Sequence, residues 1–163
     1  MSIIEVCQWL QDTEVGTQIR ESVWTFPILE GTHLLTIAIS VGTLLVMDLR
    51  LAGLLFTRQK VSDITKAVMP ISIFGFTVMF ITGIFLFLSQ AVKAYGSIYF
   101  KLKVLFLLLA GVNALVFELT MRNKIHDWDA DAVPPWRARM AGICGMILWA
   151  SVIAACRTMA YNF

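Results

Sequence analysis

The sequence predicts an all-α fold, a four-helix transmembrane bundle preceded by a short N-terminal interfacial amphipathic helix. Of the 163 residues, 58% are hydrophobic and 15% are charged, whereas soluble domains are about 45–50% apolar and about 25% charged. Four apolar stretches are each close to the roughly 20 residues that a spanning helix needs. The short segments of alternating hydrophobicity typical of a transmembrane barrel do not occur.

The N-terminal segment predicts an amphipathic helix that lies at the membrane surface. The run Ser2-Ile3-Ile4-Glu5 has the S-x-x-E pattern of a capping box. Apolar residues then recur at helical spacing with polar residues between them, a pattern typical of interfacial helices. We expect Gly16 to break this helix and residues 17–22 to form a second short turn. The apolar positions are Ile3, Val6, Cys7 and Leu10.

No cleavable signal peptide is predicted. The first thirty residues lack a basic segment followed by an apolar core, and Arg20 is their only strong base among five acidic residues. We therefore divide the chain into an interfacial helix, 1–22, and a four-helix transmembrane domain, 23–163.

The four predicted spans follow one another with short connections. The first covers about 27–56, and we expect it to be one helix that continues past the bilayer. Thirty helical residues extend about 45 Å, more than the hydrocarbon thickness of about 30 Å. The other spans are 67–92, 97–121 and 140–156.

The distribution of basic residues predicts the orientation. With four spans, the termini and the 93–100 loop share one side, which carries five bases, and the opposite side carries eight. The positive-inside rule assigns the eight to the cytoplasm. We expect a multi-pass protein of the bacterial cytoplasmic membrane with both termini in the periplasm. The five are Arg20, Lys93, Lys101, Lys103 and Arg157; the eight are Arg50, Arg58, Lys60, Lys66, Arg122, Lys124, Arg137 and Arg139.

Other common classes of site find little support. The three cysteines form no C-x-x-C pair, so we interpret them as packing residues. The net charge is +2 and no basic cluster indicates nucleic-acid binding. The acidic residues at 127, 129 and 131 predict a solvated loop, because the glycine and the distal glutamate of a calcium loop are missing.

Lys103 is the first candidate functional residue. Only fourteen uncharged residues separate it from Glu118, so at least one of the two must lie at membrane depth or extend out of it. An ionisable group at that depth predicts a functional site. The alternative is that Lys103 extends its amine to the lipid headgroups.

His33 is the predicted partner of Lys103. Each lies about two turns from the outer end of its span, and Arg157 lies at a similar depth. An imidazole is a natural ligand for haem iron, a neutral lysine amine can be the second ligand, and Arg157 would pair with a propionate. The alternative for His33 is a hydrogen bond to Glu30, one turn earlier.

Small residues on the second span allow either close helix packing or the approach of a flat ligand. They include Gly75 and Thr82, which share one sector of the helix. Asn113 lies near the stripe of Lys103 on the third span. The predicted cofactor-binding residues are therefore His33, Lys103, Arg157, Asn113 and Gly75, with His33 and Lys103 as the metal ligands and no catalytic residue assigned.

The chain resembles an uncharacterised bacterial family of four-span membrane proteins. The resemblance rests on FPILEGTHLL at 26–35, DLRLAG at 48–53, FKLK at 100–103, GVNA at 111–114 and RTMAY at 157–161, and it covers nearly the whole chain. The layout is more distantly similar to membrane-bound protoporphyrinogen oxidases and to CopD-like copper-resistance proteins.

The resemblance to the oxidases implies a haem site. In that family a first-span histidine and a third-span lysine are the essential pair, associated with b-type haem, and His33 and Lys103 match those positions. The chain departs from the oxidase pattern at Val41, at Asp48-Leu49-Arg50 and at Asn113. The resemblance therefore implies binding of haem b rather than oxidase activity.

We expect a b-type haem-binding membrane protein that carries out electron transfer or redox chemistry with a quinone or a redox partner protein. Whether it is an enzyme stays open. One alternative is a non-catalytic subunit of an oligomer or larger membrane complex, in which the polar residues serve helix packing. Another is CopD-like copper handling, although the eight methionines form no M-x-x-M pair and are typical apolar filler.

Overall fold

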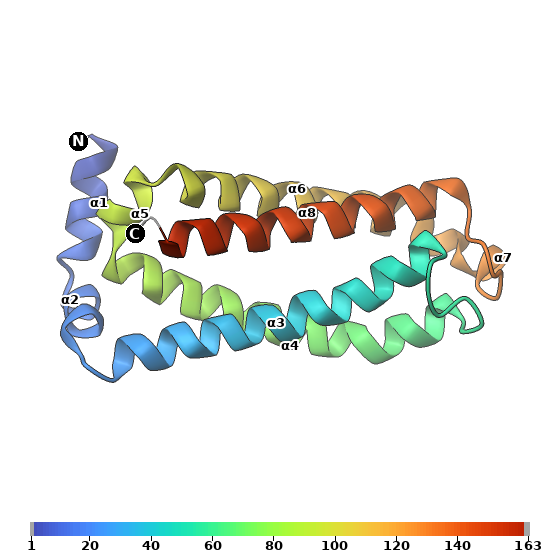
Figure 1. Cartoon of the computed structure of the whole chain (residues 1–163), viewed down its shortest axis with the longest axis horizontal. Helices are drawn as coiled ribbons and strands as arrows, with labels where there is room; N and C mark the ends of the chain where they lie inside the picture. Colours follow the sequence, from blue (N-terminus) through green and yellow to red (C-terminus); the bar gives the residue numbers. More distant parts are fainter. Residues whose placement is uncertain (1, 162–163) are drawn as a thin grey trace.

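The computed structural model describes residues 2–161, apart from the side chains of residues 122 and 160. Four long helices run alternately up and down the molecule (Figure 1). All four are long and apolar enough to cross a membrane. The predicted all-α four-helix bundle is thus confirmed, and the protein is a multi-pass membrane protein. The long helices are α3 (Thr25–Ala52), α4 (Val61–Ser89), α6 (Ile98–Met121) and α8 (Trp136–Tyr161).

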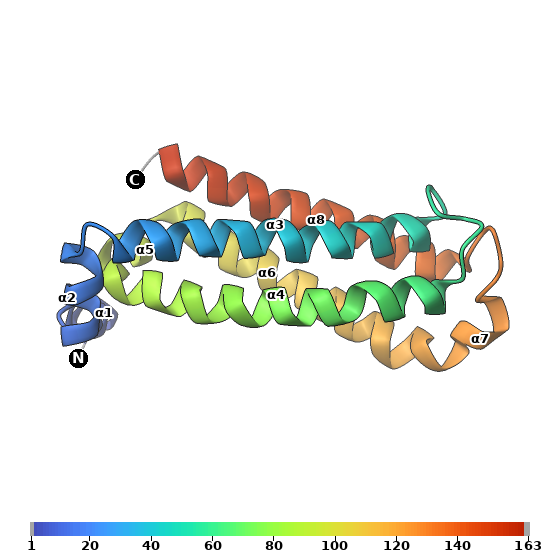
Figure 2. The same ribbon diagram turned by 90° about the horizontal axis from the view of Figure 1, so that it is seen from below.

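Helix α3 is the central element of the bundle. It packs along α4 on one side and along α8 on the other, and α6 packs along α8. Figures 1 and 2 show the result as two helix pairs, α3 with α4 and α6 with α8. In the described part of the chain α4 and α6 share no comparable seam, although the rings of Phe87 and Phe100 stack 5.5 Å apart near one end.

The seam between α3 and α4 is polar and close. Residues of α3 face α4 at alternating steps of three and four, the spacing of a left-handed helix pair. The hydroxyl oxygens of Thr43 and Ser72 lie 2.6 Å apart. Ser40 fills the space at Gly75, because a Cβ there would overlap its hydroxyl oxygen. The seam-facing residues of α3 are His33, Thr36, Ser40, Thr43 and Met47.

The seam between α3 and α8 depends on two glycines. A Cβ on Gly142 would lie 2.5 Å from the carbonyl oxygen of Asp48 and 3.0 Å from the amide nitrogen of Ala52. A Cβ on Gly145 would lie 2.5 Å from an oxygen of the Asp48 carboxylate. Larger residues at these two positions would therefore separate the helices.

The first span ends earlier than expected. Helix α3 begins at Thr25 and stops at Ala52 rather than continuing to Phe56. Gly53 takes a left-handed conformation, with φ of 73°, and its N–H bonds back to Arg50. A glycine in this conformation is a common helix stop, because residues with a Cβ adopt it at a cost.

The other spans differ from expectation mainly at their ends. Helix α4 begins six residues before the predicted 67 and stops at Ser89. Gln90 then starts a separate short helix, α5 (Ala91–Gly96), which the prediction had merged into the second span. Helix α6 begins one residue after the predicted 97 and ends at the predicted 121, and α8 contains the predicted 140–156 region.

Arg50 ties two loops together at the end of the bundle opposite the termini. Its side chain is fully buried, and its Nε donates to the carbonyl of Gln59 at 2.8 Å. Its Nη2 donates to the carbonyl of Asp131 at 2.9 Å. The loop after α3 is thereby joined to the segment after α7 (Ile125–Trp128), which follows the 3₁₀ turn η1 (Arg122–Lys124).

An apolar cluster packs at the same end, made of Met47, Leu51, Val61, Ile64, Met121, Trp128 and Ala138.

Asp129 caps α4 instead of being simply solvated, as the acidic loop had been expected to be. Its carboxylate accepts the Ser62 N–H at 2.8 Å and the Ser62 hydroxyl at 2.6 Å. Burial opposes ionisation of Asp129, but the two bonds from Ser62 and the charges of Lys60 and His126 outweigh it, so its pKa is lowered. The ionised carboxylate satisfies a free N–H at the helix start.

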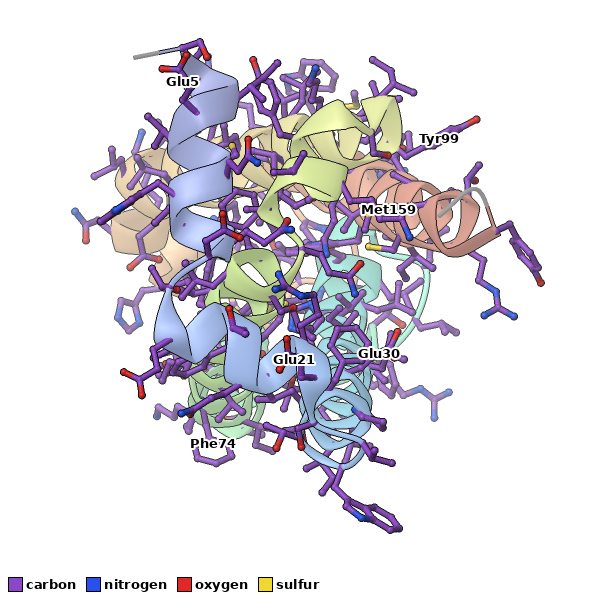
Figure 3. The ribbon with its side chains drawn as sticks, turned by 90° about the vertical axis from the view of Figure 1, so that its left-hand side faces the viewer. Glu5, Glu21, Glu30, Phe74, Tyr99 and Met159 are labelled. Atoms are coloured by element: carbon purple, nitrogen blue, oxygen red, sulfur yellow. The ribbon has the colours of Figure 1, made fainter. Side chains whose placement is uncertain are left out.

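The N-terminal segment lies across the opposite end of the bundle, as Figure 3 shows from that side. The predicted capping box is present, with Ser2 and Glu5 bonded reciprocally. However, Gly16 does not break the helix. The helix α1 (Ile3–Gln11) stops at Asp12, and Gly16 lies inside a second helix, α2 (Glu14–Glu21), capped by Thr13.

Helix packing at Gly142 gives a direct test of the central position of α3. We expect Gly142→Ala to lower the stability by about 1–3 kcal/mol, because its Cβ would press on the α3 backbone. Gly111→Ala is the matched control, since nothing lies within 4 Å of its Cβ position and alanine favours a helix by up to about 1 kcal/mol. Thermal unfolding in detergent measures both, and equal effects of the two variants would contradict the packing.

Candidate functional site

His33 is buried between α3 and α4. Its side chain is 9% exposed, and its Nδ1 lies 3.0 Å from the hydroxyl oxygen of Thr82. The ring also packs on Gly83, where a Cβ would lie 3.1 Å from the His33 Cε1. The alternative partner, Glu30, is exposed near the N-terminal end of the bundle (Figure 3). The imidazole is therefore bound to a neighbouring helix and not to its own.

Two polar groups of α4 lie at the imidazole, the Thr82 hydroxyl and the Met79 carbonyl. The Thr82 hydroxyl has one proton, and the carbonyls of Val78 and Met79 lie 2.8 and 3.1 Å from its oxygen. When the hydroxyl donates this proton to its own helix, its oxygen accepts a hydrogen bond from the N–H at Nδ1 of His33. A neutral imidazole protonated at Nδ1 has its lone pair on Nε2. In that tautomer Nε2 is the nitrogen that can bind a metal.

Lys103 lies on α6, and its side chain is half-buried. The two residues that the sequence singled out for a metal therefore lie on different helices, His33 in the α3–α4 seam and Lys103 on α6. Three helices, α3, α4 and α6, contribute to this His33–Lys103 site.

The other three predicted cofactor-binding residues have contacts of a different kind. Gly75 accommodates Ser40 within the α3–α4 seam. Asn113 donates its side-chain N–H to the carbonyl of Ala141 at 3.0 Å and so joins α6 to α8. Arg157 is exposed and lies over the Tyr161 ring, 5.2 Å from its centroid. These contacts are those of helix packing and of a surface side chain.

A group of three or more metal-binding side chains does not occur among the described residues, counting His, Cys, Asp and Glu. The donor set at His33 and Lys103 is an imidazole and an amine, which is enough for the two axial positions of a haem iron. The cysteines are free, with Cys7 buried and Cys144 exposed.

Sequence reasoning missed two residues that matter for the polar interior. Thr82 was grouped with small packing residues, although its hydroxyl is the side-chain hydrogen-bond partner of His33. Asp48 was not among the predicted site residues, and the structure puts its carboxylate against Gly145 of α8. Helical periodicity would have placed Asp48 on a face of α3, but it does not say that α8 covers that face.

The bond between His33 and Thr82 predicts a specific cost for losing the hydroxyl. We expect Thr82→Val to lower the stability by about 1–3 kcal/mol, because it removes a buried acceptor while preserving the side-chain shape. Thr77→Val is the control, since its exposed hydroxyl bonds only to the Ile73 carbonyl of its own helix. Thermal unfolding in detergent compares the two. A Thr82→Val protein as stable as Thr77→Val would argue against the buried bond.

Comparison of the chain with curated proteins and with solved structures gives no match. The expected similarity to protoporphyrinogen oxidases and to CopD-like proteins therefore finds no support there, whereas the expected uncharacterised family is consistent with a family model that matches. The model of that family, described as a family of unknown function (DUF6644), matches residues 21–162. Because this covers most of the chain, the protein belongs to the DUF6644 family.

Proposed function

We propose that the protein binds b-type haem in the membrane, with Nε2 of His33 and the amine of Lys103 as axial ligands. The observation that carries the proposal is the bond between His33 and Thr82. Metal-binding histidines generally donate their second ring N–H to a fixed acceptor, which sets the tautomer and aims the other nitrogen at the metal. With Nδ1 at the Thr82 hydroxyl, His33 fits this arrangement in the tautomer that leaves the lone pair on Nε2.

The surroundings of the site suit such a ligand. Lys103 offers a second nitrogen ligand from a different helix, α6, and a lysine amine binds a metal in its neutral form. Because α4 and α6 share no packed seam in the described part of the chain, a planar group can enter between them without separating packed helices. Haem, when bound, supplies one-electron chemistry that a protein can use with a quinone or a redox partner protein.

The proposal predicts a visible spectrum. Protein purified in detergent from haem-sufficient cells should show a Soret band. His33→Ala should abolish it, with partial recovery on adding imidazole, whereas Lys103→Met should keep haem but shift the band. Lys101→Met is the control, because Lys101 is exposed and lies 4.8 Å from the Tyr95 ring centroid.

Absence of a Soret band from a folded, helical wild-type protein would refute haem binding. The same protein without haem but with bound copper would favour copper handling instead. A protein with neither would favour a non-catalytic subunit of a larger membrane complex. Equal spectral changes in the Lys101 and Lys103 variants would remove Lys103 from the site.

We further propose that the protein lies in the bacterial cytoplasmic membrane with both termini in the periplasm. The support is the excess of bases on the side of the loops 53–60 and 122–135. A reporter that is active only outside the cytoplasm should therefore be active when fused after residue 163 and inactive when inserted at residue 132. The reverse pattern would invert the orientation without affecting the haem proposal.

A further inference from the structure

A groove of about 560 Å³ lies between the loop after α3 and the first turns of α4. Its floor is apolar and comes from both helices, whereas its rim is polar and comes from the loop and the start of α4. The floor residues are Val46, Ile64, Ala67 and Val68, and the rim residues are Arg58, Gln59, Lys60 and Asp63. The His33–Lys103 site shares none of these residues.

The apolar and polar parts of the groove lie at different depths. Val46 stands six residues before the end of α3, and Val68 stands seven residues after the start of α4. At 1.5 Å per residue, the floor extends about 10 Å along the helices from the loop. The rim therefore lies at one end of the bundle and the floor lies inside the span.

The loop itself indicates where the membrane surface lies. Leu54, Leu55 and Phe56 are consecutive and are 62%, 53% and 42% exposed. Three adjacent exposed apolar side chains are unfavourable in water but favourable at the boundary between headgroups and acyl chains. Arg58 and Lys60 follow directly and are exposed as well, which places them at headgroup level.

The charge of the rim selects among lipids. Among the lining residues, Arg58 and Lys60 carry two positive charges and Asp63 one negative charge, so the lining is cationic by one unit. Asp129 lies outside the lining and interacts with Lys60, which leaves Arg58 as the rim base without that partner. Basic pockets at the ends of transmembrane helices attract anionic headgroups, and the attraction amounts to about 1 kcal/mol, or about fivefold in affinity, for each base.

We propose that this groove binds an anionic phospholipid of the bilayer, with one acyl chain on the floor and the phosphate at Arg58 and Lys60. The apolar floor explains why the ligand is a lipid and not a soluble anion. The cationic rim explains why an anionic headgroup is preferred over a zwitterionic one. The inference does not depend on the proposed haem site or on which end of the bundle is cytoplasmic.

Native mass spectrometry of the detergent-purified protein tests this proposal. Equal amounts of phosphatidylglycerol and phosphatidylcholine with identical acyl chains are offered, and we expect the anionic lipid to be retained about fivefold more. The variant R58Q/K60Q should abolish the preference. The control K124Q/R137Q removes two exposed bases at the same end but outside the groove, and it should keep the preference.

A second variant tests the floor without changing any charge. A67W fills the groove from an exposed helix position, so it should lower retention of the anionic lipid while the protein keeps its helix content. Equal retention of both lipids by the wild type would overturn the proposal. So would loss of preference in the control, unchanged binding in A67W, or displacement of the lipid by equimolar glycerol phosphate, which would indicate a site for a soluble anion.

Discussion

Close packing on both sides of α3 is the constraint on which the rest of the bundle depends. In a bilayer, apolar surface gives helices little reason to associate, because lipid tails are as apolar as the helices themselves. Close backbone approach and polar contacts must hold the helices together instead. Helix α3 has both. Its Ser40 side chain packs against Gly75 of α4, and its turn at Asp48 packs against Gly142 and Gly145 of α8.

This arrangement gives the two residues of the site different supports. His33 sits in the α3–α4 seam, where Thr82 and Gly83 restrain its ring. Lys103 sits on α6, which reaches the bundle mainly through α8. In the proposed haem site, His33 would be the ligand held in a helix seam, and Lys103 would be the ligand that a substrate or small gas could replace. The difference follows from which helix pairs share a close seam, not from the chemistry of either side chain.

The sequence predicted the fold because length and hydropathy alone decide how many helices cross a membrane. It missed the end of α3, because the apolar run continues through Leu54 and Leu55 while the left-handed Gly53 stops the helix. It also missed Thr82, since the periodicity of one helix does not give its register against another. Residue type likewise could not show whether Gly75 faces a ligand or, as in the structure, packs against the Ser40 side chain.

Arg50 shows why charge and burial have to be considered together. It counts among the eight bases that set the predicted orientation, yet it is fully buried and donates to backbone carbonyls in two loops. A buried guanidinium is tolerated only where such acceptors offset its desolvation. Omitting both Arg50 and the half-buried Lys103 from the count leaves seven bases against four, so the direction of the bias depends on neither.

The bond from Arg50 to the Gln59 carbonyl also holds the chain between Arg58 and Lys60, so the buried base positions the two exposed bases at the rim of the groove.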